Sequence, residues 1–134
     1  MNIVTIDGIT YDVFVTDVSE DFSILYSENT GRTMSQGARM TLDPLGTFFA
    51  HKVTFACKTG KETEFDALYT YLSKPRINGV RLKIVHDQSD LTYDAYVSSG
   101  GRSVKRIDAK KGKIYWDVFS ANFVPMEAQV IFGE

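Results

Sequence analysis

The chain has 134 residues and a net charge of −2, with 43% hydrophobic and 24% charged residues. This balance is ordinary for a globular protein. It excludes a disordered chain and a protein that binds nucleic acid through bulk positive charge. The length predicts one domain over residues 1–134, large enough to bury roughly two-thirds of the surface of the unfolded chain.

Cysteine content and hydropathy bear on the compartment. Cys57 is the single cysteine, so an internal disulfide is ruled out and a reducing compartment fits. The N-terminal segment has neither a basic region nor a long apolar core, so we expect no signal peptide. No stretch approaches the ~20 apolar residues that a membrane span needs. We therefore expect a soluble protein, made in the cytoplasm, with no membrane partner.

The first half of the chain reads as strands and turns. Asp7-Gly8 lies between the β-prone runs Asn2–Ile6 and Ile9–Val15 and predicts a two-residue hairpin. Residues 30–38 predict a loop or an irregular strand, and Asp43–Gly46 predicts a turn with proline at its first corner. We expect the other strands of this half at Val18–Tyr26, Arg39–Leu42 and Thr47–Lys58.

One helix is predicted, at Glu62–Lys74. Its apolar side chains recur at i, i+3, i+4 and i+7, so they form one stripe on a helical surface; they are Phe65, Leu68, Tyr69 and Leu72. Either Thr59, three residues before Glu62, or Thr63 is a candidate cap. Pro75 ends the helix because the residue before a proline is pushed out of the α region.

The second half returns to strands. We expect polar turns at Asp87–Asp90 and Asp108–Gly112, and a break or an outward bend of the strand at Ser98–Gly101. The tail 126–134 is left open as strand or coil. The predicted strands of this half are Arg81–His86, Leu91–Val97, Val104–Ile107 and Lys113–Phe123.

The predicted fold is mainly β. The strands follow one another too closely for helical crossovers, so their pairing is mainly antiparallel. We expect a β-sandwich or a partly closed barrel of about eight strands, with one α-helix packed against it.

Candidate catalytic groups are few. The two histidines, His51 and His86, have no metal-like partners at close spacing, so we expect solvated or partly buried imidazoles. Cys57 lies on the inward phase of its strand, which predicts a core cysteine in place of a nucleophile. The glycines from Gly31 to Gly37 do not match a phosphate-binding loop. We therefore expect no enzyme, no metal and no cofactor.

Charge is uneven in two places. An acidic stretch contains Asp17, Glu20, Asp21 and Glu28, without a calcium-loop pattern. A basic stretch contains Arg102, Lys105, Arg106, Lys110, Lys111 and Lys113, and it predicts a projecting hairpin or loop. The basic arm is either simply solvated or contacts a partner. For a functional arm we favour a protein partner over nucleic acid, because the acidic stretch of a neighbouring copy offers the complementary charge.

Aromatic residues make up 13% of the chain. Core and cross-strand packing is their expected role. The alternative is a carbohydrate- or protein-binding β-sandwich that uses exposed rings, with Tyr93, Tyr96, Tyr115 and Trp116 as candidates.

Three segments together resemble a known family. They are the Asp-Gly hairpin followed by Val18–Phe22 and Glu28–Thr33, the block Thr47–Phe55 that runs into the helix, and the pair Tyr93–Gly100 and Lys111–Phe123. This layout resembles small prophage-encoded tail proteins of Gram-positive bacteria. It also resembles, more loosely, the tail-tube and distal-tail (baseplate hub) domains of long-tailed phages.

The resemblance implies a structural virion protein. Such domains are two packed β-sheets with one flanking helix, assembled as hexameric rings around the tail channel. It implies a homo-oligomer, other phage tail proteins as partners, no specific nucleic-acid binding, and a place in the virion after synthesis in the bacterial cytoplasm. The residues expected at subunit contacts are the basic arm together with the Gly31–Arg39 loop, including Arg32 and Arg39.

Overall fold

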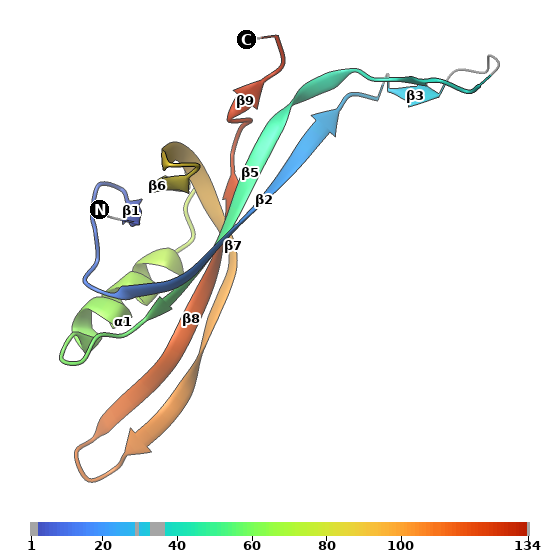
Figure 1. Ribbon diagram of the computed structural model, residues 1–134. Helices are drawn as coiled ribbons and strands as arrows, with labels where there is room; N and C mark the ends of the chain where they lie inside the picture. The colour runs from blue at the N-terminus through green and yellow to red at the C-terminus, as the bar shows by residue number, and fades with distance from the viewer. Residues whose placement is uncertain (1–2, 29, 33–36, 134) are drawn as a thin grey trace.

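An antiparallel sheet of seven strands and one helix make up most of the structure (Figure 1), a computed structural model that describes residues 3–28, 30–32 and 37–133. The strand order is β1-β6-β7-β8-β5-β2, with β9 pairing with β5, and a small second sheet joins β3 and β4. The predicted antiparallel β architecture with one flanking helix is confirmed. The elements are β1 (Val4–Ile6), β2 (Phe14–Tyr26), β3 (Gly31–Arg32), β4 (Met40–Thr41), β5 (Pro44–Ala56), α1 (Glu62–Leu72), β6 (Val80–His86), β7 (Ser89–Asp108), β8 (Lys113–Pro125) and β9 (Val130–Ile131).

The first turn has the predicted geometry, but the strand after it does not form as expected. Asp7 and Gly8 have φ angles of 50° and 80°, as a two-residue hairpin turn requires. The returning chain makes only an isolated bridge between Ile6 and Ile9. β1 pairs with β6, which buries Val4 and Ile6 in the core, and β2 starts at Phe14. The predicted strand Ile9–Val15 is therefore wrong over most of its length.

Two predicted turns were also misplaced, whereas residues 98–101, predicted as a break or an outward bend of the strand, form a bend. Residues 44–46 belong to β5, which begins at Pro44. Proline is tolerated as the first residue of a strand, because the N–H that it lacks is not needed there for pairing. The hairpin between β6 and β7 turns through Asp87 and Gln88 alone, since His86 pairs with Ser89. Residues 98–101 do not break β7. A register shift between Val97 and Ser99 bends the strand, which continues to Asp108.

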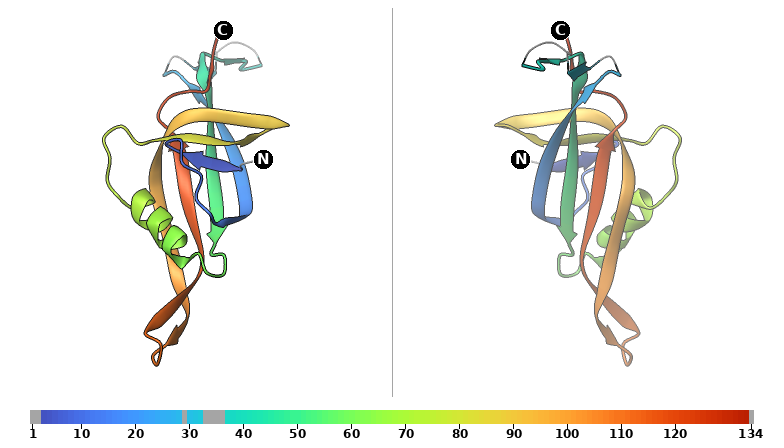
Figure 2. Two further views of the ribbon diagram at one scale, coloured as in Figure 1. Left: turned by 90° about the vertical axis from the view of Figure 1, so that its left-hand side faces the viewer. Right: turned by 90° about the vertical axis from the view of Figure 1, so that its right-hand side faces the viewer.

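This bend in β7 turns the sheet over on itself. The first part of β7 pairs with β6, and the second part pairs with β8. As a result the β6–β7 hairpin lies across β2, β5 and β8 (Figure 2), and the inner faces of the two parts enclose the core. The buried core side chains are Val4, Ile6, Val53, Phe55, Phe65, Leu68, Leu72, Val80, Leu82, Ile84, Tyr93, Ala95, Phe119, Ala121 and Phe123.

Helix α1 closes one end of this core. Phe65, Leu68 and Leu72 are buried, and the half-buried ring of Tyr69 meets Phe119 edge-on at 5.3 Å. The predicted apolar stripe is thus confirmed. The helix ends at Leu72, before the predicted Lys74. Its N-cap residue is Lys61 with no side-chain cap hydrogen bond, so neither threonine candidate caps it.

Two ribbons project from the body in opposite directions (Figure 1). β5 pairs with β8 only from His51 to Phe55, so residues 21–26 and 44–50 leave the body as a two-stranded ribbon. We call this ribbon, with β3 and β4 at its tip, the β2–β5 arm. Residues 103–118 form the second ribbon, the β7–β8 arm. The tail left open in the sequence adds β9, which pairs with Gly46 and Thr47.

Candidate functional site

The β2–β5 arm exposes large apolar side chains. Phe22 is 68% exposed and Leu25 is 52% exposed, on a ribbon too thin to have a core. Gln129 fastens the chain before β9 to this arm, accepting a hydrogen bond from the Phe49 N–H and donating one to its carbonyl. The exposed apolar residues of the arm and the adjoining tail are Phe22, Ile24, Leu25, Tyr26, Met40, Leu42, Leu45, Val130, Ile131 and Phe132. Phe22 and Leu25 lie three positions apart in a regularly paired stretch of β2, so apolar side chains are exposed on both faces of the arm.

The β7–β8 arm carries the basic residues that the sequence singled out. Lys110 and Lys111 are exposed in the turn at its tip, and Lys105 is exposed on β7. The Arg106 guanidinium lies 4.2 Å from the centre of the Tyr115 ring, and the ammonium of Lys113 lies 5.1 Å from the same ring. The predicted projecting basic hairpin is therefore present.

Arg102 is used within the chain. Its side chain is only 16% exposed, and its Nη1 lies 2.8 Å from Oδ1 of Asp66 on α1. The guanidinium is stacked 4.0 Å from the Tyr69 ring centre and 3.9 Å from that of Trp116. Register explains this position, because Arg102 pairs with Phe119, whose side chain is on the helix-facing side of the sheet.

Lys113 also has a partner on the helix. Its Nζ lies 2.9 Å from Oε1 of Glu62, and this hydrogen bond raises the pKa of Lys113 and lowers that of Glu62. Arg102 therefore fixes the root of the β7–β8 arm to α1, and Lys113, which pairs with Asp108 beside the tip turn, fixes the far part of the arm to the start of the same helix. Arg32 and Arg39 lie near the tip of the other arm, at the opposite end of the molecule. Residues 33–36 of the predicted contact loop lie outside the described residues.

The acidic candidates do not form one patch. Asp17 and Asp21 pair with Thr54 and Ala50 and lie exposed on the outer face of β2. Glu28 is exposed beyond the end of β2, toward the tip of the arm. Glu20 points to the inner face, where its Oε2 bonds to both histidines. Three of the four acidic residues thus lie on the outer face or near the arm tip, whereas Glu20, although exposed, is bound to the two histidines.

A cluster of polar groups under the β6–β7 hairpin was missed by sequence reasoning. His51 is 2% exposed, with its Nε2 2.8 Å from Glu20 Oε2 and its Nδ1 2.6 Å from the Tyr93 hydroxyl. His86 Nδ1 lies 2.8 Å from the same Glu20 oxygen. The expectation of solvated or partly buried imidazoles is wrong for His51, which is fully buried. The missed signal was the phase of His51, which alternates inward with Val53 and Phe55.

Burial and hydrogen bonding shift the pKa values in this cluster. Burial lowers the pKa of His51, even though Glu20 acts to raise it. The hydrogen bond to Glu20 raises the pKa of His86. Desolvation acts to raise the pKa of Glu20, but the hydrogen bonds from His86 and His51 outweigh it, and the pKa falls. Burial raises the pKa of Tyr93, so its hydroxyl stays protonated and can donate to His51.

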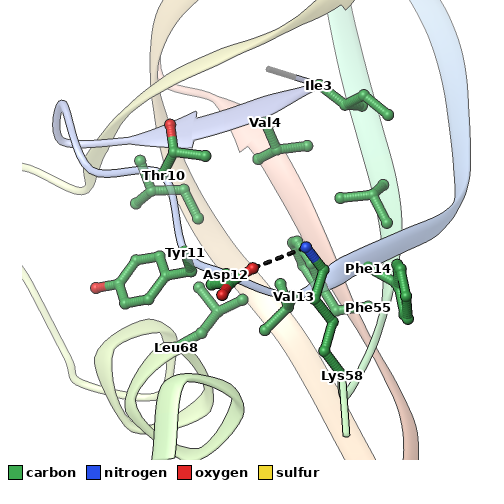
Figure 3. Close-up of a pocket in the computed structure, with 12 residues that line it drawn as sticks. Ile3, Val4, Thr10, Tyr11, Asp12, Val13, Phe14, Phe55, Lys58 and Leu68 are labelled. Carbon is green, nitrogen blue, oxygen red and sulfur yellow. Dashed lines mark hydrogen bonds and ion pairs between the residues drawn. The ribbon is translucent and has the colours of Figure 1, made fainter. Parts of the chain in front are cut away.

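Cys57 and one hollow beside α1 complete the set of candidate groups. Cys57 is half-buried beside the core just after β5, so the prediction of a core cysteine holds only in part, and burial raises the pKa of its thiol. A hollow of about 460 Å³ lies between β1, the chain before β2 and α1 (Figure 3). Its lining is largely apolar and its charged groups, Asp12 and Lys58, are paired at 2.7 Å. Neither a cysteine nor a histidine lines it.

Two neighbouring rows on the outer face of the sheet are polar and built mainly from small side chains. One row across four strands contains Ser19, Lys52, Asn122 and Ser99, and the next contains Asp17, Thr54, Ser120 and Gly101. Asn122 donates a 2.7 Å hydrogen bond to Ser99 along the first row. This face carries charges of both signs and no large apolar side chain in these rows, unlike the arms.

The aromatic candidates for a binding platform are dispersed. Tyr93 is buried against His51, and Trp116 is half-buried under Arg102. Arg106 and Lys113 lie over Tyr115, whereas Tyr96 is exposed on another part of β7. These four rings do not share one surface.

Comparison with known proteins gives no identity: no family model matches the chain, and no curated protein matches it. Within the ranges that the structure describes, no group of three or more potential ligand residues is arranged to hold a metal ion. In the same ranges, no helix is both long and apolar enough for a bilayer crossing.

Proposed function

We propose that this chain is a structural subunit that assembles with copies of itself into a ring, as a component of a bacteriophage tail. The position would be in the tail tube, the distal tail or the baseplate hub, with other tail proteins as neighbours. The observation that carries the proposal is the β2–β5 arm. A two-stranded ribbon is marginally stable in water by itself, and this one is joined by β9 over only two residue pairs and exposes apolar side chains such as Phe22 and Leu25.

Charge favours a second copy as the partner. The β7–β8 arm ends in Lys110 and Lys111, whereas the outer face of β2 carries Asp17 and Asp21. These patches are separate on one molecule, because Asp17 lines up through Thr54 with Ser120 of β8, seven positions along that strand from Lys113 at the tip turn. Complementary patches at different places on one subunit make a head-to-tail contact, and such contacts close into rings when the rotation allows it. Opposite charges would also orient the approach of the two copies.

The polar outer face is compatible with a channel wall. Its rows of serine, threonine, asparagine and glycine carry both charge signs, so the face lacks the positive charge that would hold a nucleic acid backbone. The resemblance in layout to phage tail domains supplies the phage assignment. In such an assembly, the projecting β2–β5 arm would be the long element through which stacked rings touch.

Charge reversal tests the proposal. Sedimentation velocity over a wide range of concentration should show oligomers for the wild-type chain. The double variant Lys110→Glu/Lys111→Glu should weaken assembly, and so should Asp17→Lys/Asp21→Lys. Mixing the two variants should restore it, because each then presents the complement of the other. A chain that stays monomeric throughout, and binds a carbohydrate, would favour the alternative of a binding module.

A further inference from the structure

The pair Glu20–His51 lies at the root of the β2–β5 arm. His51 pairs with Glu20 on β2 and with Phe123 on β8. β5 pairs with β8 from His51 to Phe55 but not from Pro44 to Ala50, and this earlier part of β5 belongs to the arm. Any contact that fixes this pair to the body therefore fixes the direction in which the arm leaves it.

The β6–β7 hairpin supplies such a contact from across the sheet. His86, at the end of β6, reaches Glu20 with its Nδ1, and its ring lies 4.9 Å from the ring of Phe49, a residue of the arm. Tyr93, on β7, holds His51 through its hydroxyl. Four strands therefore meet at one carboxylate oxygen and one buried imidazole. Figure 2 shows the β6–β7 hairpin crossing β2 and β5.

The hydrogen bonds define which protons the cluster holds. Glu20 Oε2 lies within hydrogen-bond distance of two imidazole nitrogens, and, despite desolvation, these hydrogen bonds lower its pKa, which favours an ionised carboxylate that accepts from both. Burial lowers the pKa of His51, which favours a neutral ring that donates from Nε2 to Glu20 and accepts the Tyr93 hydroxyl proton at Nδ1. A proton added to His51 Nδ1 would put a charge on a ring that is 2% exposed, and the Tyr93 hydroxyl would have to change from donor to acceptor. A proton added to Glu20 would remove an acceptor from one of the histidines.

We propose that Glu20, His51 and His86 form a proton-controlled clamp that fixes the β2–β5 arm to the body near neutral pH and releases it on acidification. Release leaves the ribbon attached only through its backbone pairing and β9, so its apolar residues no longer have a fixed orientation. The consequence for ring assembly rests on the proposed function. The release of the arm itself does not.

The groups that face the clamp come from each neighbouring element. Glu20 lies on β2, His51 on β5, His86 on β6 and Tyr93 on β7, and Asp87 Oδ2 in the following turn is 3.6 Å from His86 Nε2. The shifts agree with the geometry. Because the pKa values of His51 and Glu20 are lowered, both groups stay unprotonated and the clamp stays closed down to a more acidic pH. Because the pKa of His86 is raised, His86 keeps the proton that it donates to Glu20 up to a more alkaline pH. Each unit of such a shift changes the opening equilibrium about tenfold.

Amide hydrogen exchange followed by mass spectrometry tests the clamp, after correction for the intrinsic exchange rate at each pH. Peptides from residues 21–26 and 44–50 should be most protected near neutral pH. Their protection should fall by about tenfold or more toward pH ~5, while peptides from β6 and β8 keep theirs. A smaller loss is expected on the alkaline side, where His86 loses its proton.

Variants give the matched controls. Glu20→Gln should exchange in the arm as fast at neutral pH as the wild type does in acid. Asp21→Asn changes the neighbouring exposed carboxylate on the other face and should keep the wild-type profile. His86→Gln, at a less buried position, should abolish only the loss of arm protection at alkaline pH. This variant replaces Glu20→Gln as the test if Glu20→Gln does not fold.

Protection of the arm that does not vary with pH, or an Asp21→Asn profile as flat as that of Glu20→Gln, would overturn the clamp. Sedimentation of the same samples separates the two proposals. Oligomers with a pH-independent arm would remove the clamp and leave the proposed function. A monomer with a pH-dependent arm would remove the proposed function and leave the clamp.

Discussion

Arg102 and Asp66 join the β7–β8 arm to helix α1 through a 2.8 Å contact between Nη1 and Oδ1. The guanidinium is also stacked on Tyr69 and Trp116, so little of it reaches solvent. Sequence reasoning placed Arg102 among the subunit contacts. Its position in the structure instead gives it a part in holding the arm at its root.

Arg102→Ala should therefore lower the free energy of unfolding by about 1–3 kcal/mol, through loss of two ring contacts and an ion pair. Urea unfolding followed by circular dichroism measures this. Lys105→Ala, three residues along the same strand and exposed, should change it by less than ~0.5 kcal/mol. Equal effects of the two variants would contradict the structural role of Arg102.

Leu68 lies in the centre of the buried face of α1, at 1% exposure. Leu68→Ala should lower the free energy of unfolding by about 2–5 kcal/mol, since it removes buried methyl groups and leaves a cavity. Thr63→Ala, exposed on the same helix and making no cap hydrogen bond, should be nearly neutral. A loss below ~1 kcal/mol for Leu68→Ala would mean that α1 does not close the core.

Gly79 enters β6 with a φ angle of 65°, and a Cβ there would lie 2.1 Å from the carbonyl oxygen of Ala95. Gly79→Ala should destabilise the fold by more than about 1 kcal/mol, because both the backbone conformation and the space exclude a side chain. Gly101→Ala is the control, since its Cβ would meet no atom within 4 Å. Thermal unfolding compares the two, and similar midpoints would argue against the observed approach of the chain to β7.

The stability of the folded chain should depend on pH through the same clamp residues. Because the folded pKa of His51 is lowered, the unfolded chain binds more protons, and stability falls as the pH drops below about 6.5. The lowered pKa of Glu20 adds a further loss at more acidic pH. His86 acts oppositely: its contribution is present below about 6.5 and is lost as the pH rises through its raised pKa.

A stability maximum near neutral pH is therefore expected from urea unfolding at a series of pH values. Glu20→Gln should abolish the loss on the alkaline side, because the raised pKa of His86 depends on its hydrogen bond to Glu20, and it should keep the loss below about 6.5 that burial of His51 causes. Stability that rises steadily on acidification would show that His51 is not the buried neutral imidazole that its hydrogen bonds require.

Local patterns predicted the local elements well. The spacing of Phe65, Leu68 and Leu72 gave the helix and its buried face, and the alternation in β5 and β6 gave two strands with the correct inward residues. The hydrophobic period carries this information within one segment. It does not say which segment pairs with which, so the partner of β1 was missed.

Long-range relationships explain the remaining differences. Glu20 and His86 are 66 positions apart, and no local signal connects them. Ser98–Gly101 has the composition of a turn, but β8 pairs with it and holds it in a bent strand, where a Cβ on Gly100 would be only 3.0 Å from the Ser120 carbonyl oxygen. The basic residues of one stretch separate into exposed lysines and the stacked Arg102 only when α1 packs beside them.

Native mass spectrometry, with electron microscopy of the same sample, tests self-assembly through the β2–β5 arm most directly. The account predicts a discrete ring of identical subunits for the wild-type chain. It predicts mainly monomer, with an unchanged near-ultraviolet circular dichroism spectrum, for Phe22→Ser/Leu25→Ser. A wild-type chain that remains monomeric at every concentration, or a variant that forms the same ring, would contradict it.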